Sequence, residues 1–147
     1  MNAKVFIDTN VLIYAKDRTD LTKQTAAAAW LEALAMRKAA VVSRQSLREY
    51  YNTATKPKHG VPRERARREV AALHAWLPPD GGFDRLQEAW DIQDRFKLQF
   101  FDCMLLAAAR AARCAYFLSE DMHDSLDVDG VQITNFLRLT PDQLLKD

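Results

Sequence analysis

A chain of 147 residues, 48% of them hydrophobic, is long enough for one globular domain and short for two. Its formal net charge of +1 excludes a general electrostatic attraction to nucleic acid, so any such attraction must come from a local patch. The apolar stretches fall far short of the roughly 20 residues that cross a membrane, and residues 1–8 read as a strand, not a signal peptide. We therefore expect a single cytoplasmic domain, residues 1–147, that does not associate with membranes.

The first part of the chain alternates short apolar runs with patterns of helical spacing. In chain order we expect a strand over 5–7, a short helix or buried segment over 11–14, a helix over 20–36, a strand over 40–43 and a helix around 47–54. Asp20 has the chemistry of an N-cap and marks the start of the helix over 20–36. Pro57 disfavours helical backbone in the residue before it, so it ends the last of these helices.

The second part of the chain continues this alternation. The expected elements are a helix through 70–77 that stops at the prolines and glycines of 78–82, an amphipathic helix over 84–97, a helix over 102–113, a strand over 115–119 and a short strand over 131–133. Within 84–97, the side chains of Leu86, Trp90 and Ile92 are expected to face inward. Strands that alternate with helices favour an α/β fold with a mostly parallel sheet covered on both faces.

Four acidic residues stand where an apolar run meets a polar turn or a helix: Asp8, Glu49, Asp102 and Asp121. They lie so far apart in the chain that only a tertiary fold brings them together. In an α/β sheet the ligand crevice lies at the carboxyl ends of the strands, and several of these acids follow expected strands. Converging carboxylates repel one another unless divalent cations neutralise them, so the pattern indicates a metal site.

Each of these acids, taken singly, also fits a purely structural role. Asp8 fits a turn that closes a strand, and Asp102 fits a helix N-cap. Glu49 fits a solvated helix position, and Asp121 fits an Asx turn. Their order and their spread along the whole chain favour the shared site.

Four stretches of the chain resemble the motifs of the PIN-domain nucleases. They run, in family order, over Phe6 to Tyr14, Ser46 to Tyr51, Phe101 to Ala109 and Leu118 to Met122. Each stretch contains one of the four acids, and the opening stretch is the most specific of them. The overall length is similar to that of the VapC-type ribonuclease toxins, a branch of the family that is usually paired with a small antitoxin.

This resemblance implies a three-layer α/β/α PIN-like domain that hydrolyses RNA phosphodiester bonds with the help of Mg²⁺ or Mn²⁺. Such hard cations prefer oxygen ligands, so carboxylates suit them better than histidines or thiols. The resemblance assigns the four acids as catalytic residues that bind the metal directly or through water. It places Thr9, Asn10 and Ser119 at the margin of the site, where they would orient a carboxylate, a metal-bound water or the phosphate. Glu120 and Asp124 flank the last acid, so each is an alternative fourth ligand.

The same resemblance implies the partners. VapC-type proteins are usually homodimers, and a VapB-type antitoxin inhibits them with a carboxy-terminal tail that reaches the acidic site, often through an arginine. A crevice of carboxylates attracts a cationic side chain, which gives this inhibition a physical basis. We therefore expect RNA as the substrate, and an antitoxin and a second copy of the chain as protein partners.

One marked cluster of positive charge lies in the middle of the chain. It comprises Lys56, Lys58, Arg63, Arg65, Arg67 and Arg68. This cluster either guides an RNA backbone, since each neutralised phosphate adds salt-dependent affinity, or forms an ordinary solvated face. The histidines His59, His74 and His123 lack metal-ligand spacing, so surface or packing roles are expected for them.

Three other functions compete with the nuclease. A haloacid-dehalogenase-like phosphatase also begins with a strand that ends in aspartate, but it needs a second aspartate two residues later, where this chain has Asn10. A receiver-like signalling domain also gathers acids and binds magnesium, yet it is phosphorylated and cleaves nothing. A PIN-like binding module without catalysis is the third, and mutation of the four acids would leave its activity unchanged.

Overall fold

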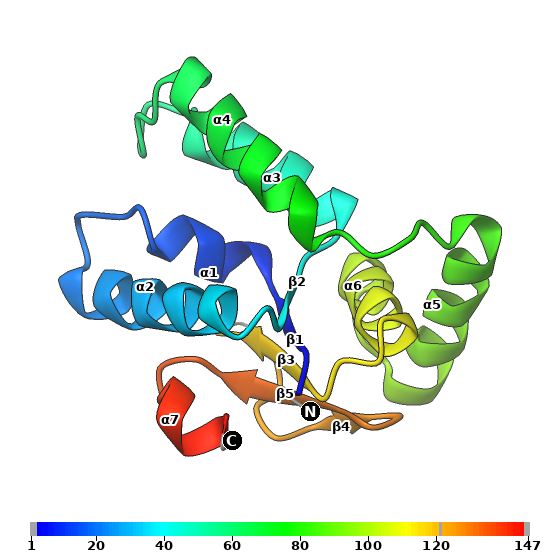
Figure 1. Cartoon of the computed structure of the whole chain (residues 1–147). Coiled ribbons are helices and arrows are strands. Elements are labelled where there is room, and N and C mark those ends of the chain that lie inside the picture. The colour runs from blue at the N-terminus through cyan, green and yellow to red at the C-terminus, as the bar shows by residue number, and fades with distance from the viewer. Residues whose placement is uncertain (1–2, 121, 146–147) are drawn as a thin grey trace.

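The protein folds as a five-stranded sheet between two layers of helices, as seen in a computed structural model that describes residues 3–120 and 122–145 (Figure 1). The strands are β1 (Val5–Ile7), β2 (Ala40–Val41), β3 (Tyr116–Ser119), β4 (Asp127–Val128) and β5 (Val131–Asn135). The helices are α1 (Thr9–Tyr14), α2 (Leu21–Met36), α3 (Arg44–Ala54), α4 (Arg63–Leu73), the short 3₁₀ helix η1 (His74–Trp76), α5 (Gly82–Phe96), α6 (Phe100–Ala111) and α7 (Pro141–Leu144). The strand order is β2-β1-β3-β5-β4, and every neighbouring pair is parallel except β4 and β5. The predicted three-layer α/β/α fold with a mostly parallel sheet is confirmed.

Side-chain caps explain where α2 and α3 begin. The carboxylate of Asp20 accepts a 3.0 Å hydrogen bond from the backbone N–H of Lys23, so α2 starts directly after it, as predicted. Ser43 caps α3 in the same way, because its hydroxyl accepts from the backbone N–H of Ser46 at 3.0 Å. This cap shortens the strand expected over 40–43 to the two residues of β2.

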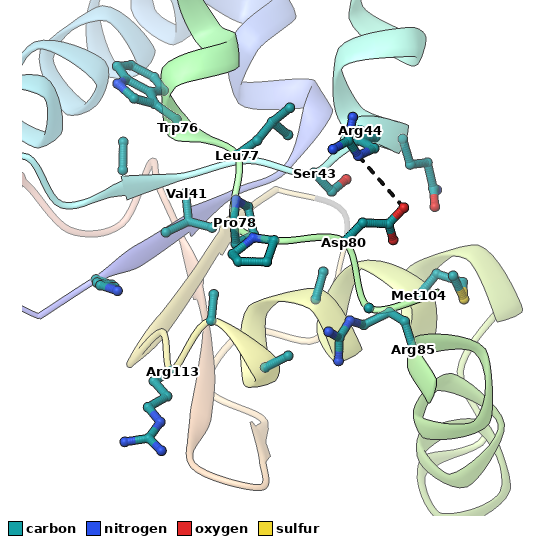
Figure 2. Close-up of a pocket in the computed structure, with 18 of the residues that line it drawn as sticks. Val41, Ser43, Arg44, Trp76, Leu77, Pro78, Asp80, Arg85, Met104 and Arg113 are labelled. Atoms are coloured by element: carbon teal, nitrogen blue, oxygen red, sulfur yellow. Dashed lines mark ion pairs between the residues drawn. The ribbon is translucent and has the colours of Figure 1, made fainter. Parts of the chain in front are cut away.

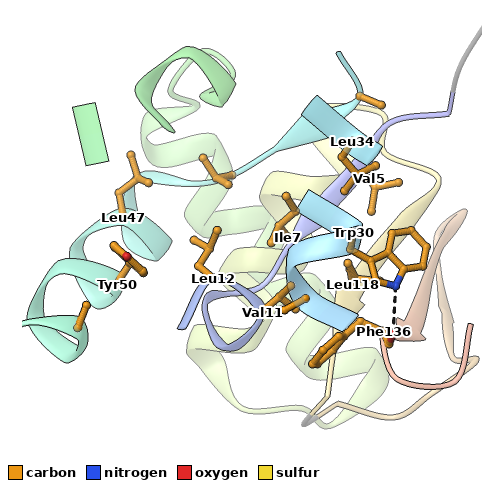
Figure 3. Close-up of a cluster of buried hydrophobic side chains, with 14 of the residues drawn as sticks. Val5, Ile7, Val11, Leu12, Trp30, Leu34, Leu47, Tyr50, Leu118 and Phe136 are labelled. Carbon is orange, nitrogen blue, oxygen red and sulfur yellow. Dashed lines mark hydrogen bonds between the residues drawn. The ribbon is translucent and has the colours of Figure 1, made fainter. Parts of the chain in front are cut away.

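Successive side chains of the central strand β1 point to opposite faces of the sheet, so the hydrophobic core has two halves. Val5 and Ile7 pack against α1, α2 and α3, whereas Phe6 faces α5 and α6 and stacks on Phe117 with ring centroids 5.1 Å apart. Trp30 lies fully buried in the first half, where its indole N–H donates to the backbone carbonyl of Phe136 at 3.0 Å (Figure 3). Helices α3 and α4 pack side by side and project beyond the sheet (Figure 1).

Two details of the expected fold need correction. Trp90 was expected to face inward but is 44% exposed, because Ala89 and Ile92 are the residues of α5 that point into the core. Trp90 instead packs edge-on against Phe83 on the surface. The short antiparallel strand β4 was not expected, and it pairs with β5 through a tight turn at Asp129. No helix in the described part of the chain is long and apolar enough to cross a bilayer.

Candidate active site

Asp8 lies at the carboxyl end of β1, in the middle of the sheet. It is buried, and its Oδ1 accepts a 2.8 Å hydrogen bond from the backbone N–H of Thr9, which makes it the N-cap of α1. Its Oδ2 accepts a 2.7 Å hydrogen bond from the hydroxyl of Ser119, the last residue of the parallel neighbour β3. The Nδ2 group of Asn10 lies 3.3 Å from that hydroxyl and 3.5 Å from Oδ2. The orientation of the Asp8 carboxylate is therefore fixed from two sides, by the first residues of α1 and by the end of β3.

Glu49 comes to the same place from α3. Its Oε2 accepts a 3.1 Å hydrogen bond from the hydroxyl of Thr9, and its Oε1 accepts a 2.8 Å hydrogen bond from the side-chain amide of Gln45. Thr9 thus contacts two acids, Asp8 through its backbone and Glu49 through its side chain. This single residue sets the position of one carboxylate relative to the other.

Asp102 enters from the opposite layer of helices, in the first turn of α6. The partial positive charge at the start of a helix favours a carboxylate there. Asp102 lines a cavity of about 420 Å³ together with Asp8 and Glu49, and we call this space the acidic cavity. Asp121, the fourth predicted acid, lies outside the described residues. The fold therefore brings three predicted acids, from a strand end and two helices, to one cavity.

The two alternative acids engage other partners. Glu120 forms an ion pair of 2.6 Å with Lys23, and burial opposes its ionisation, but hydrogen bonds from Lys23 and Tyr14 outweigh that effect and lower the pKa of its carboxyl. Asp124 accepts a hydrogen bond from the backbone N–H of Asn135 at 2.8 Å and pairs with Arg138 at 2.7 Å. Neither acid is among the described residues that line the acidic cavity.

Other residues of the acidic cavity escaped the sequence analysis. Gln45 and Thr53 stand four residues before and after Glu49, on the same face of α3, so helical spacing from Glu49 would have found them. His59, for which a surface or packing role was expected, lies in the wall of the cavity beside Lys58. No local pattern marks His59 as a site residue, because the loop between α3 and α4 brings it there, whereas Lys58 belongs to the predicted basic cluster.

The predicted basic cluster divides between this loop and α4. Within the cluster, Lys58 is the described residue that lines the acidic cavity. Arg65 pairs with Glu69 at 3.6 Å, and the guanidinium of Arg67 donates to the hydroxyl of Tyr51 at 3.2 Å. The arginines of α4 therefore lie along the projecting helix pair.

The chemistry of the acidic cavity suits a magnesium or manganese ion. No group of three Asp, Glu, His or Cys side chains within residues 3–120 and 122–145 lies close enough together to enclose a metal ion. Magnesium does not need such a cage, since it keeps several waters and binds through one or two carboxylates. Asp8 and Asp102 supply these across one cavity, and Thr9, Asn10 and Glu49 add further oxygen atoms to its wall. The residues present therefore fit a hydrated hard cation.

The fold and the site together define the class of this protein. It is an α/β protein with a site at the carboxyl edge of its sheet, where the central strand and the flanking helices place carboxylates in one crevice. Within that class, residues 5–126 match the PIN domain family, and the chain belongs to this family. The family predicted from the four motifs is thereby confirmed. No curated protein sequence matches the chain.

Solved structures with the same fold include several toxin proteins. A toxin-antitoxin complex from Klebsiella pneumoniae aligns with a TM-score of 0.60 and 21% identity, over 87% of this chain and 95% of that one. VapC20 of Mycobacterium tuberculosis, described as a sarcin-ricin loop cleaving toxin, aligns with a TM-score of 0.55 and 18% identity, over 78% and 87% of the two chains. VapBC2 from Rickettsia felis, bound to a promoter DNA fragment, aligns with a TM-score of 0.62 and 14% identity, over 89% and 97%.

Proposed function

We propose that this PIN domain protein is an endoribonuclease that depends on Mg²⁺ or Mn²⁺ and acts as the toxin of a type II toxin-antitoxin pair. The observation that supports the proposal best is the convergence of Asp8, Glu49 and Asp102 on one cavity at the carboxyl end of the sheet. Three carboxylates from distant parts of the chain are costly to gather unless a cation uses them. The toxins among the structural neighbours support the same class of activity.

In this proposal Asp8 and Asp102 hold the ion, and Asp121 is the further ligand that the motifs predict. A bound divalent cation supplies charge for the scissile phosphate and lowers the pKa of a bound water. The hydroxyl of Ser119 and the backbone N–H of Thr9 hold the Asp8 carboxylate in one rotamer, so no reorganisation is needed when the substrate arrives. Glu49 binds the ion or one of its waters while the Thr9 hydroxyl and the Gln45 amide fix its direction.

The proposal includes protein partners. A cavity lined by carboxylates attracts a cationic side chain, so an antitoxin tail that carries an arginine is expected to compete with the ion and the RNA. The complexes of toxins with antitoxins among the structural neighbours support such a partner. A homodimer in the cytoplasm is part of the same proposal.

The test is cleavage of a panel of structured and single-stranded RNAs with magnesium, manganese or chelator. The variants Asp8→Asn and Asp102→Asn are compared with Asp84→Asn, which removes one exposed carboxylate of α5 that does not line the acidic cavity. We expect metal-dependent cleavage that Asp84→Asn retains and the two site variants lose. Absence of cleavage by folded protein on every RNA and metal, or equal cleavage by all variants, would overturn the proposal. Labelling by a small phosphoryl donor would identify the receiver-like function instead.

A further inference from the structure

A second and larger cavity, of about 850 Å³, lies beside the acidic one (Figure 2). Its walls come from β2, the first turns of α3, the segment 75–81 and the face of α6. Figure 2 shows Val41 and Pro78 near its middle, Arg44 and Arg85 on the side of Asp80, and Arg113 at the other end. We call this space the basic groove, for the charges described next.

Positive charge dominates the rim of the basic groove. Its cationic residues are Lys4, Lys38, Arg44, Arg48, Arg85 and Arg113. Asp80 is the one acid among the described residues of its wall, and it lies 3.9 Å from the guanidinium of Arg44. An ion pair at this distance between exposed groups neutralises little of the arginine's charge. Arg85 is also paired, with Glu88, so the positive field of the groove comes mainly from its other cationic residues, on a chain whose net charge is only +1.

The floor of the basic groove is apolar. Val41 and Pro78 lie near its middle, between Arg44 and Arg113, and Met104 adds a further apolar side chain to the lining. A folded acidic protein surface would present carboxylates to the rim but few flat apolar groups to the floor. A single nucleic-acid strand presents both, because phosphates run along one side and unpaired bases lie on the other. A duplex keeps its bases inside and matches the floor less well.

The basic groove continues into the acidic cavity. Gln45 and Phe101 line both spaces, and Phe101 is 66% exposed although it directly precedes Asp102. Helix α3 carries positive charge on one face and negative charge on another, since Arg44 and Arg48 line the basic groove and Glu49 lines the acidic cavity. A strand that lies in the groove therefore leads to the carboxylates over the ring of Phe101.

We propose that the basic groove binds the single-stranded segment of an RNA substrate next to the phosphate that is cut. This inference rests on the proposed ribonuclease function. Arg44 and Arg48 contact phosphates, the apolar floor receives bases, and Phe101 stacks on the base at the junction of the two spaces. The substrate class is thus an RNA with an unpaired stretch on one side of the cut.

Binding measured without cleavage tests the groove separately from the chemistry. Fluorescence anisotropy of a labelled single-stranded RNA in chelator gives the affinity at several salt concentrations. The test variant Arg44→Gln/Arg48→Gln removes two exposed charges, and Arg44→Lys/Arg48→Lys retains them. Lys97→Gln, an exposed lysine at the end of α5 that lines neither cavity, controls for loss of charge. Arg67→Gln/Arg68→Gln tests the competing basic surface of α4.

We expect Arg44→Gln/Arg48→Gln to lower the affinity for RNA about tenfold or more. The slope of log affinity against log salt concentration should fall in magnitude by about 1.4, since each phosphate contact of a single strand contributes roughly 0.7. The lysine pair and Lys97→Gln should bind close to the wild-type protein. Phe101→Leu should lower affinity without changing the salt slope, because stacking releases no counterions.

Three results would overturn the groove proposal. Wild-type affinity in the glutamine pair, with RNA still cut by the wild-type protein, would refute the groove and leave the nuclease intact. A larger loss in the α4 pair would assign RNA binding to that helix. A glutamine pair that changes the sedimentation coefficient but binds RNA normally would show that a second copy of the chain covers the groove. Cleavage by the wild-type protein, checked alongside, distinguishes these failures from failure of the nuclease itself.

Discussion

The buried hydroxyl of Ser119 donates a 2.7 Å hydrogen bond to Oδ2 of Asp8, and so links the carboxyl ends of two adjacent parallel strands behind the wall of the acidic cavity. Because a group that orients a metal ligand typically contributes 10–100-fold to metal affinity or activity, Ser119→Ala should lower cleavage by about that range. Metal titrations of activity should show a higher metal requirement in the variant.

Loss of a buried hydroxyl also lowers stability, so a matched control is needed. Thr134→Val removes a buried hydroxyl from β5 that donates to the backbone carbonyl of Gln132 and lines neither cavity. It should lower the free energy of unfolding while leaving the metal requirement unchanged. Equal metal requirements in Ser119→Ala and the wild-type protein would contradict a positioning role for Ser119.

Thr9 offers a test of the contact between α1 and α3. Thr9→Val keeps the shape of the side chain but removes the donor to Glu49, whereas Thr9→Ser keeps the hydroxyl. We expect Thr9→Val to reduce kcat about tenfold or more and Thr9→Ser to retain most of it. Steady-state kinetics on a defined RNA would check this, and a serine variant as impaired as the valine variant would show that packing, not the hydrogen bond, is what Thr9 supplies.

Metal binding should be visible as stabilisation of the fold. A ligand that binds only the folded state at ten times its Kd raises the free energy of unfolding by about 1.4 kcal/mol. Thermal unfolding with increasing Mg²⁺, against a chelator baseline, should show this for the wild-type protein and for Asp84→Asn. Asp102→Asn should show much less of it. The same response to Mg²⁺ in Asp102→Asn as in the wild-type protein would argue against Asp102 as a ligand.

The turn between β4 and β5 has a predictable acid sensitivity. The hydrogen bonds from Arg95, above all, and from Arg110 hold the pKa of Asp129 at about 2, against the opposing effect of burial. An Asp carboxyl in the unfolded chain has a pKa of about 3.9. The carboxylate therefore stabilises the fold fully above about pH 4, and this contribution disappears as the pH falls through about 2.

Asp129→Asn should consequently lower the melting temperature slightly at pH 7 and have little effect near pH 2. Asparagine is a suitable replacement because Asp129 has a φ of 53°, which asparagine tolerates. Melting curves of both proteins from pH 2 to pH 7 would measure the difference. A gap in melting temperature that stays constant with pH would contradict the ionic explanation.

Much of the fold was predictable because strong local signals agree with the tertiary structure. The apolar run before Asp8 and the N-cap at Asp20 correctly located β1 and the start of α2. The Asp129-Gly130 pair was a further usable signal, since both residues have positive φ values of 53° and 93° and such a pair favours a two-residue hairpin turn. Trp90 was misplaced because an apolar side chain at helical spacing does not reveal which face of an amphipathic helix packs.

The acidic cavity was predictable in outline, since each acid lies in a motif of its own. The basic groove was not, because its cations come from the ends of unrelated elements. Lys4 precedes β1 and Arg113 follows α6, and no spacing in the chain relates them. The one cluster that the sequence does display, over residues 56–68, lies mainly along α4. Charge that converges only in the folded state leaves no local pattern.

Helix α3 carries groups from both spaces on one stiff element, with Arg44 and Arg48 toward the groove and Glu49 toward the carboxylates. An α-helix rises about 1.5 Å per residue and hardly stretches. The distance between the arginines that would bind the RNA strand and the carboxylate at the proposed cleavage site is therefore constant. Helix α3 would then fix the distance between the bound stretch of RNA and the cut. If the protein is the proposed ribonuclease, each cut should therefore fall at a fixed distance from the single-stranded stretch bound in the groove, whatever the base sequence at the cut.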